Sequence, residues 1–227
     1  MGSDALESYA LNGYYRERAV FGSADVDAMV EHYMELRAKG PHPGDSSGVE
    51  GRTIRREADP LRGYPRMINM HLWDSASARW MNSPRLRETA SALLAQPAEI
   101  LQTMVYFKPP GSRGQAFHQD NVYLKITPIM GAWVALDPAG GENGGMTMVR
   151  GSHLLGLLPV EQADTDLYFT ATHSAIAIGT NGIHQKISVP VILNIRCAKA
   201  TLTATGLAVA IAAIMAVIVV PIFAPSV

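Results

Sequence analysis

The N-terminal part of the chain has a hydrophobic pattern typical of helices. After Ser23-Ala24-Asp25, a good helix start, apolar residues follow at nearly helical spacing until Gly40. A second helical stretch is expected within residues 76–95, beginning at Ser83-Pro84, because a proline at the first helical position loses no hydrogen bond. The apolar face of this second stretch would comprise Leu86, Ala90, Leu93 and Leu94. A loop is expected at residues 40–51, and residues 7–22 are expected to form a short polar segment before the first helix.

From residue 99 the pattern changes to short apolar runs separated by glycine and proline. Such runs at close spacing are typical of antiparallel strands in a barrel or sandwich. The runs are ILQTMVYF, NVYLKI, GAWVAL and MTMV, and ISVPVILNI is a candidate for one more strand. We therefore expect a mainly β protein with N-terminal helices, in which a domain over residues 1–170 carries helices at about 23–95 and a β core at about 99–170.

The C-terminal part of the chain has a different character. Residues 171–200 diverge from the strand pattern, and residues 201–227 form an apolar tail without charged side chains. Gly206–Ala224 is almost wholly apolar and about as long as the roughly 20 residues of a bilayer-spanning helix. One interpretation is a membrane anchor, for which the preceding Arg196 and Lys199 predict a cytoplasmic N-terminal domain. The other is a sequence foreign to the fold, produced by a change of reading frame.

Composition limits the classes of function. The formal net charge of −1 argues against a nucleic-acid partner, since nucleic-acid-binding domains usually carry a strong basic excess. The single cysteine, Cys197, fits a reducing compartment, and the first 30 residues have no apolar core for export, so we expect a cytoplasmic protein. Five arginines gather in one stretch, namely Arg52, Arg55, Arg56, Arg62 and Arg66. For this cluster, a solvated surface is favoured over contact with an anionic substrate.

The candidate chemistry lies in His118-Gln119-Asp120. In an extended segment, residues two apart point to the same face, so an imidazole and a carboxylate project side by side. Two histidines and one carboxylate on one face of an Fe(II) ion form a common oxygenase site with open positions for substrate and oxygen. The spacing alone is a weak signal, because a histidine and an aspartate at a strand end often simply face water.

The surrounding sequence strengthens this signal. MVYFKPPGSRGQAFHQD is followed by GAWVALD and then by GGENGGMTMVRGSHLLGLLP. This succession resembles the phytanoyl-CoA dioxygenase family of Fe(II)- and 2-oxoglutarate-dependent oxygenases, over about residues 8–170. The resemblance implies a double-stranded β-helix, that is, a jelly-roll, cupin-like core. It also implies an enzyme that uses Fe(II), 2-oxoglutarate and dioxygen to hydroxylate a small organic substrate.

The resemblance also assigns roles to individual residues. His118 and Asp120 match the iron ligands of the family. Met104 and Trp133 match positions that line the 2-oxoglutarate pocket, and Gln119, between the ligands, is a further candidate for that pocket. Core packing is the ordinary alternative for Met104 and Trp133. For His153, a hydrogen-bonded structural role is favoured over metal ligation.

The second half of the family's site is not recognisable here. Family members add a second histidine as third iron ligand and then an arginine whose two-pronged contact holds the 2-oxoglutarate carboxylate. His184 and Arg196 stand at approximately the required separation, but the residues that normally flank them are missing. Either these two complete the site or the C-terminal sequence is foreign and the core incomplete. Three functions therefore stay open: an oxygenase of impaired activity, a catalytically inactive β-helix binding protein, and a cupin-like sugar- or metal-binding module.

Overall fold

The computed structural model describes most of the N-terminal two-thirds of the chain and the backbone of four later strands. The described ranges are residues 1–45, 64–110, 112, 114–125, 128–139 and 145–163. The later strands are β7 (Thr172–Ser174), β8 (Lys186–Val189), β9 (Ile192–Arg196) and β10 (Ala212–Pro221). Four of the five clustered arginines, His184 and the second half of the loop expected at residues 40–51 lie outside the described residues.

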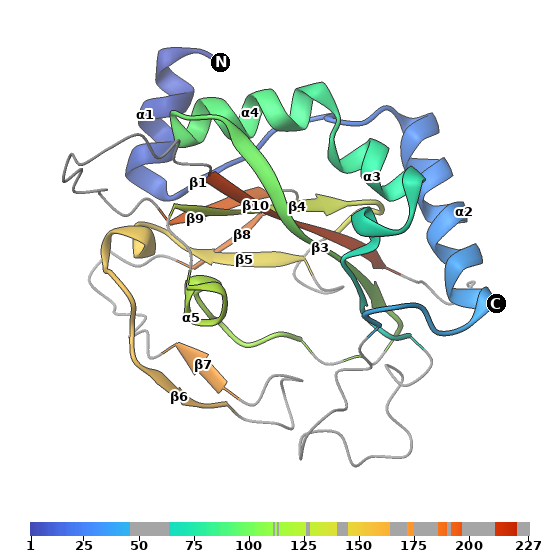
Figure 1. The fold of residues 1–227 in the computed structure, drawn as a ribbon. Helices are drawn as coiled ribbons and strands as arrows, with labels where there is room; N and C mark the ends of the chain where they lie inside the picture. Colours follow the sequence, from blue (N-terminus) through green and yellow to red (C-terminus); the bar gives the residue numbers. More distant parts are fainter. Residues whose placement is uncertain are drawn as a thin grey trace, which may run out of the picture.

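Four helices form a layer over one face of the main sheet (Figure 1). They are α1 (Ser3–Asn12), α2 (Ser23–Lys39), α3 (Ser75–Met81) and α4 (Pro84–Leu94). The predicted start and end of α2 are confirmed, as is the start of α4 at Ser83-Pro84, where the Ser83 hydroxyl accepts from Leu86 N. The four residues predicted for the apolar face of α4 are all buried. α1 and the separate helix α3 were not predicted.

The main sheet has six strands in the order β1-β9-β4-β10-β3-β2. Its remaining members are β1 (Tyr14–Tyr15), β2 (Met67–Ile68), β3 (Ala98–Lys108) and β4 (Ile129–Ala135). The pairs β1–β9, β4–β9 and β2–β3 are antiparallel, as expected. β10 instead runs parallel to both β3 and β4, between which it lies, so the expectation of a wholly antiparallel core is wrong at this strand.

Smaller strand pairs and short helices lie on the other side of the main sheet, away from the helical layer (Figure 1). β5 (Met146–Val149) pairs with β8, and β6 (Val160–Gln162) with β7, both antiparallel. α5 (Asn121–Leu124) precedes β5 along the chain, and the 3₁₀ helix η3 (Ser152–Leu154) stands between β5 and β6. The 3₁₀ helix η2 (Met70–Leu72) instead contacts α3, and its Met70 belongs to the core beneath the helical layer. NVYLKI was expected to be a strand, but Asn121–Leu124 form a helical turn that begins directly after Asp120.

The expected C-terminal apolar helix is not found. Ala212–Pro221, the described part of Gly206–Ala224, is strand β10. A run of apolar residues does not by itself distinguish a buried strand from a buried helix, and the isoleucines and valines here favour the strand. Of the helices in the described ranges, none is long and apolar enough to cross a membrane.

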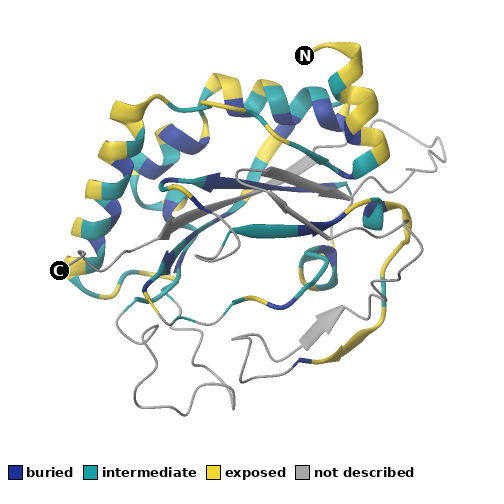
Figure 2. Cartoon of the chain, turned by 180° about the vertical axis from the view of Figure 1, so that it is seen from behind, coloured by how far each residue is buried: buried dark blue, intermediate teal, exposed yellow. Residues whose placement is uncertain are grey.

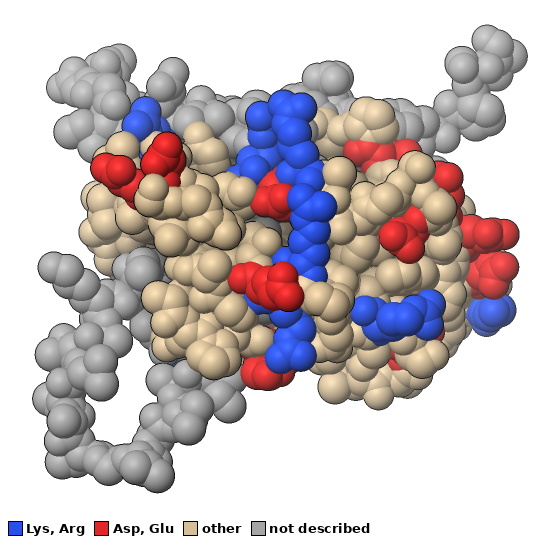
Figure 3. All heavy atoms as spheres, turned by 90° about the horizontal axis from the view of Figure 1, so that it is seen from above, with Lys and Arg blue, Asp and Glu red and all other residues tan. Residues whose placement is uncertain are grey.

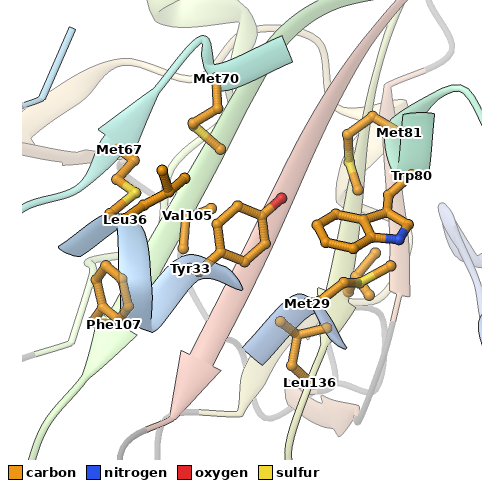
Figure 4. Close-up of a cluster of buried hydrophobic side chains, with 11 residues drawn as sticks. Met29, Tyr33, Leu36, Met67, Met70, Trp80, Met81, Val105, Phe107 and Leu136 are labelled. Carbon is orange, nitrogen blue, oxygen red and sulfur yellow. The ribbon is translucent and has the colours of Figure 1, made fainter. Parts of the chain in front are cut away.

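The principal core lies between the helical layer and the sheet (Figures 2 and 4). Figure 4 shows Tyr33 and Met29 of α2 facing Trp80 and Met81 of α3, with Val105 of β3 beside them. Full burial of a large apolar side chain stabilises a fold by about 1.5–3 kcal/mol, so this cluster fixes the helices to the sheet. The helices present their exposed residues outward, and Figure 3 shows a row of Lys and Arg with Asp and Glu alongside on that face. Arg85–Glu17 and Arg87–Glu99 are ion pairs of α4.

Candidate metal centre

His118 and Asp120 directly precede α5, which lies on the side of the sheet opposite the helical layer (Figure 1). His118 Nε2 is 3.2 Å from Asp120 Oδ1, and both side chains are partly exposed. Two ligand atoms bound at right angles to one metal, at bond lengths of about 2.1 Å, would be about 3.0 Å apart. The observed separation therefore suits two neighbouring ligands of one divalent ion, and an imidazole nitrogen with a carboxylate oxygen is a donor set that Fe(II) accepts.

The orientation of the His118 ring is set by its second nitrogen. His118 Nδ1 lies 2.7 Å from the carbonyl oxygen of Ala116. Because a carbonyl oxygen only accepts, Nδ1 carries the proton and donates, which leaves Nε2 as the ligand atom. The Gln115 amide nitrogen lies 3.1 Å from that Nε2. This ring fixation by a backbone carbonyl is the arrangement that supports metal-ligating histidines generally.

The electrostatics of the pair are also those of a ligand pair. Burial lowers the pKa of His118, but the hydrogen bond and the negative charge of Asp120 outweigh burial and raise the pKa above its ordinary value. Asp120 stands at the N-cap position of α5, yet its carboxylate is directed to His118 rather than to the amides of that helix. His118 and Asp120, which together are called the metal pair, thus share a site for a positive charge that a proton or a metal ion can occupy.

Met104 and Trp133 both contact Tyr106 on the same side of the sheet. The Tyr106 hydroxyl donates to Met104 Sδ over 3.2 Å, and the buried Trp133 ring packs against Tyr106, Ala135 and Met146. Burial is the largest cause that raises the pKa of Tyr106; the positive charge of Arg66 lowers that pKa and the negative charge of Asp120 raises it. Tyr106 therefore joins the two predicted pocket residues, since it contacts both.

Tyr106 and Arg66 are the members of this region that sequence reasoning missed. Alternation along β3 was the signal available for Tyr106, since Met104 and Tyr106 are two residues apart and share a face. The Arg66 guanidinium carbon lies 5.7 Å from the Tyr106 ring centroid, and Arg66 is half-buried. Arg66 directly precedes β2, whose pairing with β3 brings its guanidinium to the Tyr106 ring, so this arginine of the cluster is only partly solvated.

The side-chain amide of Gln119 is bonded to the backbone of residues 156 and 158. Its amide nitrogen donates to the Gly156 carbonyl over 2.8 Å, and its amide oxygen accepts from Leu158 N over 2.9 Å. His153 is also engaged in the protein structure: its buried ring donates from Nε2 to the Ala10 carbonyl over 2.9 Å. This bond supports the structural interpretation of His153.

A complete ligand set is not found in the part of the chain that the structure describes. Within those residues, no group of three or more His, Cys, Asp or Glu side chains surrounds one point. His184 lies outside them, and Arg196 ends β9 opposite Ile129 of β4. A cavity of about 420 Å³ lies between residues 16–21 and β4, and Trp133 is among its lining residues. Its lining includes neither His118 nor Asp120, so it is separate from the candidate metal centre.

The arrangement of strands and helices is shared with solved structures of other proteins. EvdO2 from Micromonospora carbonacea var. aurantiaca, complexed with 2-oxoglutarate, superposes with a TM-score of 0.55 and 19% identity over 86% of this chain and 81% of that chain. The epimerase SnoN, in complex with Fe3+, alpha ketoglutarate and nogalamycin RO, gives a TM-score of 0.59 and 20% identity over 85% of this chain and 73% of that one. At these identities the likeness defines the fold.

Sequence comparison defines the family. The profile of the phytanoyl-CoA dioxygenase (PhyH) family matches residues 9–182, and the chain belongs to that family. The phytanoyl-CoA dioxygenase domain-containing protein 1 of Danio rerio is 36% identical over 92 residues, which are 39% of this chain and 32% of the relative. The Caenorhabditis briggsae homologue is 29% identical over 108 residues, 46% of this chain and 35% of the relative. The chain thus spans about a third of the length of these relatives.

Proposed function

We propose that this protein is an Fe(II)- and 2-oxoglutarate-dependent dioxygenase that hydroxylates a small organic substrate. The observation that carries the proposal is the His118–Asp120 pair, with ligand atoms 3.2 Å apart and the imidazole fixed by Ala116. Family membership supports it, as do the iron and 2-oxoglutarate named in the solved structures of the same fold. In this proposal His118 and Asp120 hold the iron.

The proposed reaction divides the work between the cofactor and the chain. When bound, the iron with 2-oxoglutarate and dioxygen supplies the oxidation: a substrate C–H becomes C–OH, and 2-oxoglutarate becomes succinate and carbon dioxide. His118 and Asp120 position the metal, and Tyr106, Met104 and Trp133 form a wall that keeps water from it. Met104 and Trp133 are proposed to line the cosubstrate pocket. The corresponding role of Gln119 stays a prediction, because its amide is engaged with Gly156 and Leu158.

The proposed activity is impaired relative to a complete site. In the described residues the metal pair has no third protein ligand, and fewer ligands mean weaker metal binding. The same observation favours the second candidate function, a catalytically inactive β-helix that binds a ligand or partner. Whether His184 and Arg196 complete the site separates the two. We further propose a cytoplasmic location; membrane association through Gly206–Ala224 stays a prediction without support from the described helices.

Succinate formation tests the proposal directly. Purified protein is incubated with Fe(II), 2-oxoglutarate and dioxygen, and succinate is quantified without added substrate, because such enzymes turn over their cosubstrate slowly when uncoupled. We expect succinate from the wild-type chain and loss to background in His118→Ala and Asp120→Ala. Asp27→Ala, on the exposed face of α2, is the matched control and should keep wild-type turnover. Loss of turnover in His184→Ala would assign the third ligand; absence of turnover in the wild type would favour the binding protein.

A further inference from the structure

We propose that Gln119 is a positioning residue: its side-chain amide clamps residues 154–159 to the metal pair and so holds His118 and Asp120 in ligand geometry. The two hydrogen bonds of the clamp are part of the structure, whereas their consequence for metal binding rests on the proposed function. This role differs from the contribution to the cosubstrate pocket that the sequence suggested for Gln119.

The clamp uses both ends of the amide. Nε2 donates to the Gly156 carbonyl over 2.8 Å, and Oε1 accepts from Leu158 N over 2.9 Å. Gly156 has a φ of 72°, a left-handed conformation that glycine adopts without strain. The turn at Gly156 presents a carbonyl and, two residues later, an N–H to the same amide. With one donor and one acceptor used, the amide is fixed in position and in rotation.

The clamped segment is mostly exposed in the part of the chain that the structure describes. Leu154, Leu155 and Leu157 are 67%, 42% and 53% exposed, so burial contributes little to its position. The segment is anchored at its ends by the buried residues His153 and Ala163. Within the described residues, the hydrogen bonds that join residues 154–159 to a distant part of the chain are the two made by Gln119.

The clamp acts on the metal pair because Gln119 stands between its two members. His118 and Asp120 are the two chain neighbours of Gln119, and Asp120 has a helical backbone conformation at the start of α5. Fixing the Gln119 side chain therefore restrains the backbone that carries both side chains of the pair. If the amide were released, the backbone could rotate about residue 119 and separate the two ligand atoms, now 3.2 Å apart. Loss of residues that orient metal ligands typically weakens metal binding by about ten- to hundredfold.

The test compares substitutions that remove different parts of the clamp. Gln119→Met has similar length and removes both hydrogen bonds, whereas Gln119→Glu keeps an acceptor for Leu158 N–H. Gln162→Met, an exposed glutamine of β6, is the matched control. Amide hydrogen exchange of Leu158 is measured by NMR in metal-free protein, and Mn(II) affinity by calorimetry. Exchange within α2 reports whether the fold is retained.

We expect Gln119→Met to lose protection at Leu158 and to bind Mn(II) about ten- to hundredfold more weakly, with exchange in α2 unchanged. Gln119→Glu should retain protection at Leu158, and Gln162→Met should resemble wild type in both measurements. Unchanged Mn(II) affinity in Gln119→Met overturns the positioning role, even if Leu158 loses protection. If the wild type binds no Mn(II), the proposed function fails instead. The inference is then tested by the NMR resonances of the His118 ring in metal-free protein. Resonances that are the same in Gln119→Met as in wild type overturn the inference.

Discussion

At the scale of single residues, the contact between Gly13 and His153 shows how closely two distant segments pack. Gly13 ends α1 in a left-handed conformation, with φ of 79°. A Cβ added at this position would lie 2.2 Å from His153 Nδ1, far inside contact distance. The His153 ring is held in place by its bond to the Ala10 carbonyl, and Gly151 N donates to Asn12 O beside it. Glycine is therefore required by both the backbone and the neighbouring ring.

We predict that Gly13→Ala lowers the free energy of unfolding by about 2–4 kcal/mol, because left-handed strain and overpacking against His153 add. Urea denaturation measures the change. Gly22→Ala is the control: Gly22 has φ of −72°, and its added Cβ would meet its nearest neighbour at 3.8 Å. The control should cost about 1 kcal/mol or less, the loss of a glycine N-cap. Equal effects of the two substitutions would contradict this packing of α1 against η3.

At the scale of elements, the start of α3 is joined to α2 by one carboxylate. Asp74 is the N-cap of α3, and its Oδ2 accepts from Ser77 N over 2.7 Å and from His32 Nε2 over 2.9 Å. Burial raises the pKa of Asp74, but the bonds from Ser77 and His32 outweigh burial and hold that pKa below its ordinary value. The Tyr33 hydroxyl meets the Ser77 hydroxyl in the core beneath, so the cap and the core support each other.

Asp74→Ala is predicted to cost about 1–2 kcal/mol of unfolding free energy at pH 7, the value of a good N-cap. Since the folded-state pKa is depressed, the ionised carboxylate stabilises the fold above its unfolded pKa, and this contribution is lost as pH falls through the folded pKa. The difference between wild type and Asp74→Ala in urea denaturation should therefore shrink from pH 7 to about pH 3. A difference that stays the same at both pH values would show that the carboxylate charge does not act here.

The success of sequence-based prediction differed between elements for physical reasons. α2 and α4 were predictable because local sequence signals mark their ends. Gly40 marks the end of α2, and Ser83-Pro84 marks the start of α4. α1 was missed because, in the described structure, Tyr9 is its only buried residue and its periodicity is weak. The C-terminal apolar run was predicted as a helix, yet Ala212–Pro221 pair with β3 and β4 as a strand. Apolarity along that run does not set its secondary structure.

The candidate site shows the same division between local and distant information. His118 and Asp120 were recognisable because their spacing is local. The partners of Gln119 are 37 and 39 residues away along the chain, so no local pattern indicates its bonds. Tyr106 and Arg66 come together because β2 pairs with β3, and this pairing is likewise a property of the fold.

At the scale of the whole molecule, the helical layer and the candidate metal site lie on opposite sides of the main sheet. The helical layer and its apolar core hold β3 and β4 from one side, and α5, which His118 and Asp120 directly precede, lies on the other side (Figure 1). β10 occupies the centre of the sheet, parallel to both of these strands. The folded chain is then expected to present His118 and Asp120 preformed, so that metal binding requires no large rearrangement.

The most direct test is an anaerobic titration of the intact chain with Co(II), whose visible absorption reports coordination. We predict saturation at one ion per chain and binding weakened at least about tenfold in both His118→Ala and Asp120→Ala, since each removes a ligand. Asp27→Ala should bind as wild type does. A wild-type chain that binds no Co(II), or variants at His118 and Asp120 that bind it equally well, would contradict the assignment of these two side chains to a shared metal.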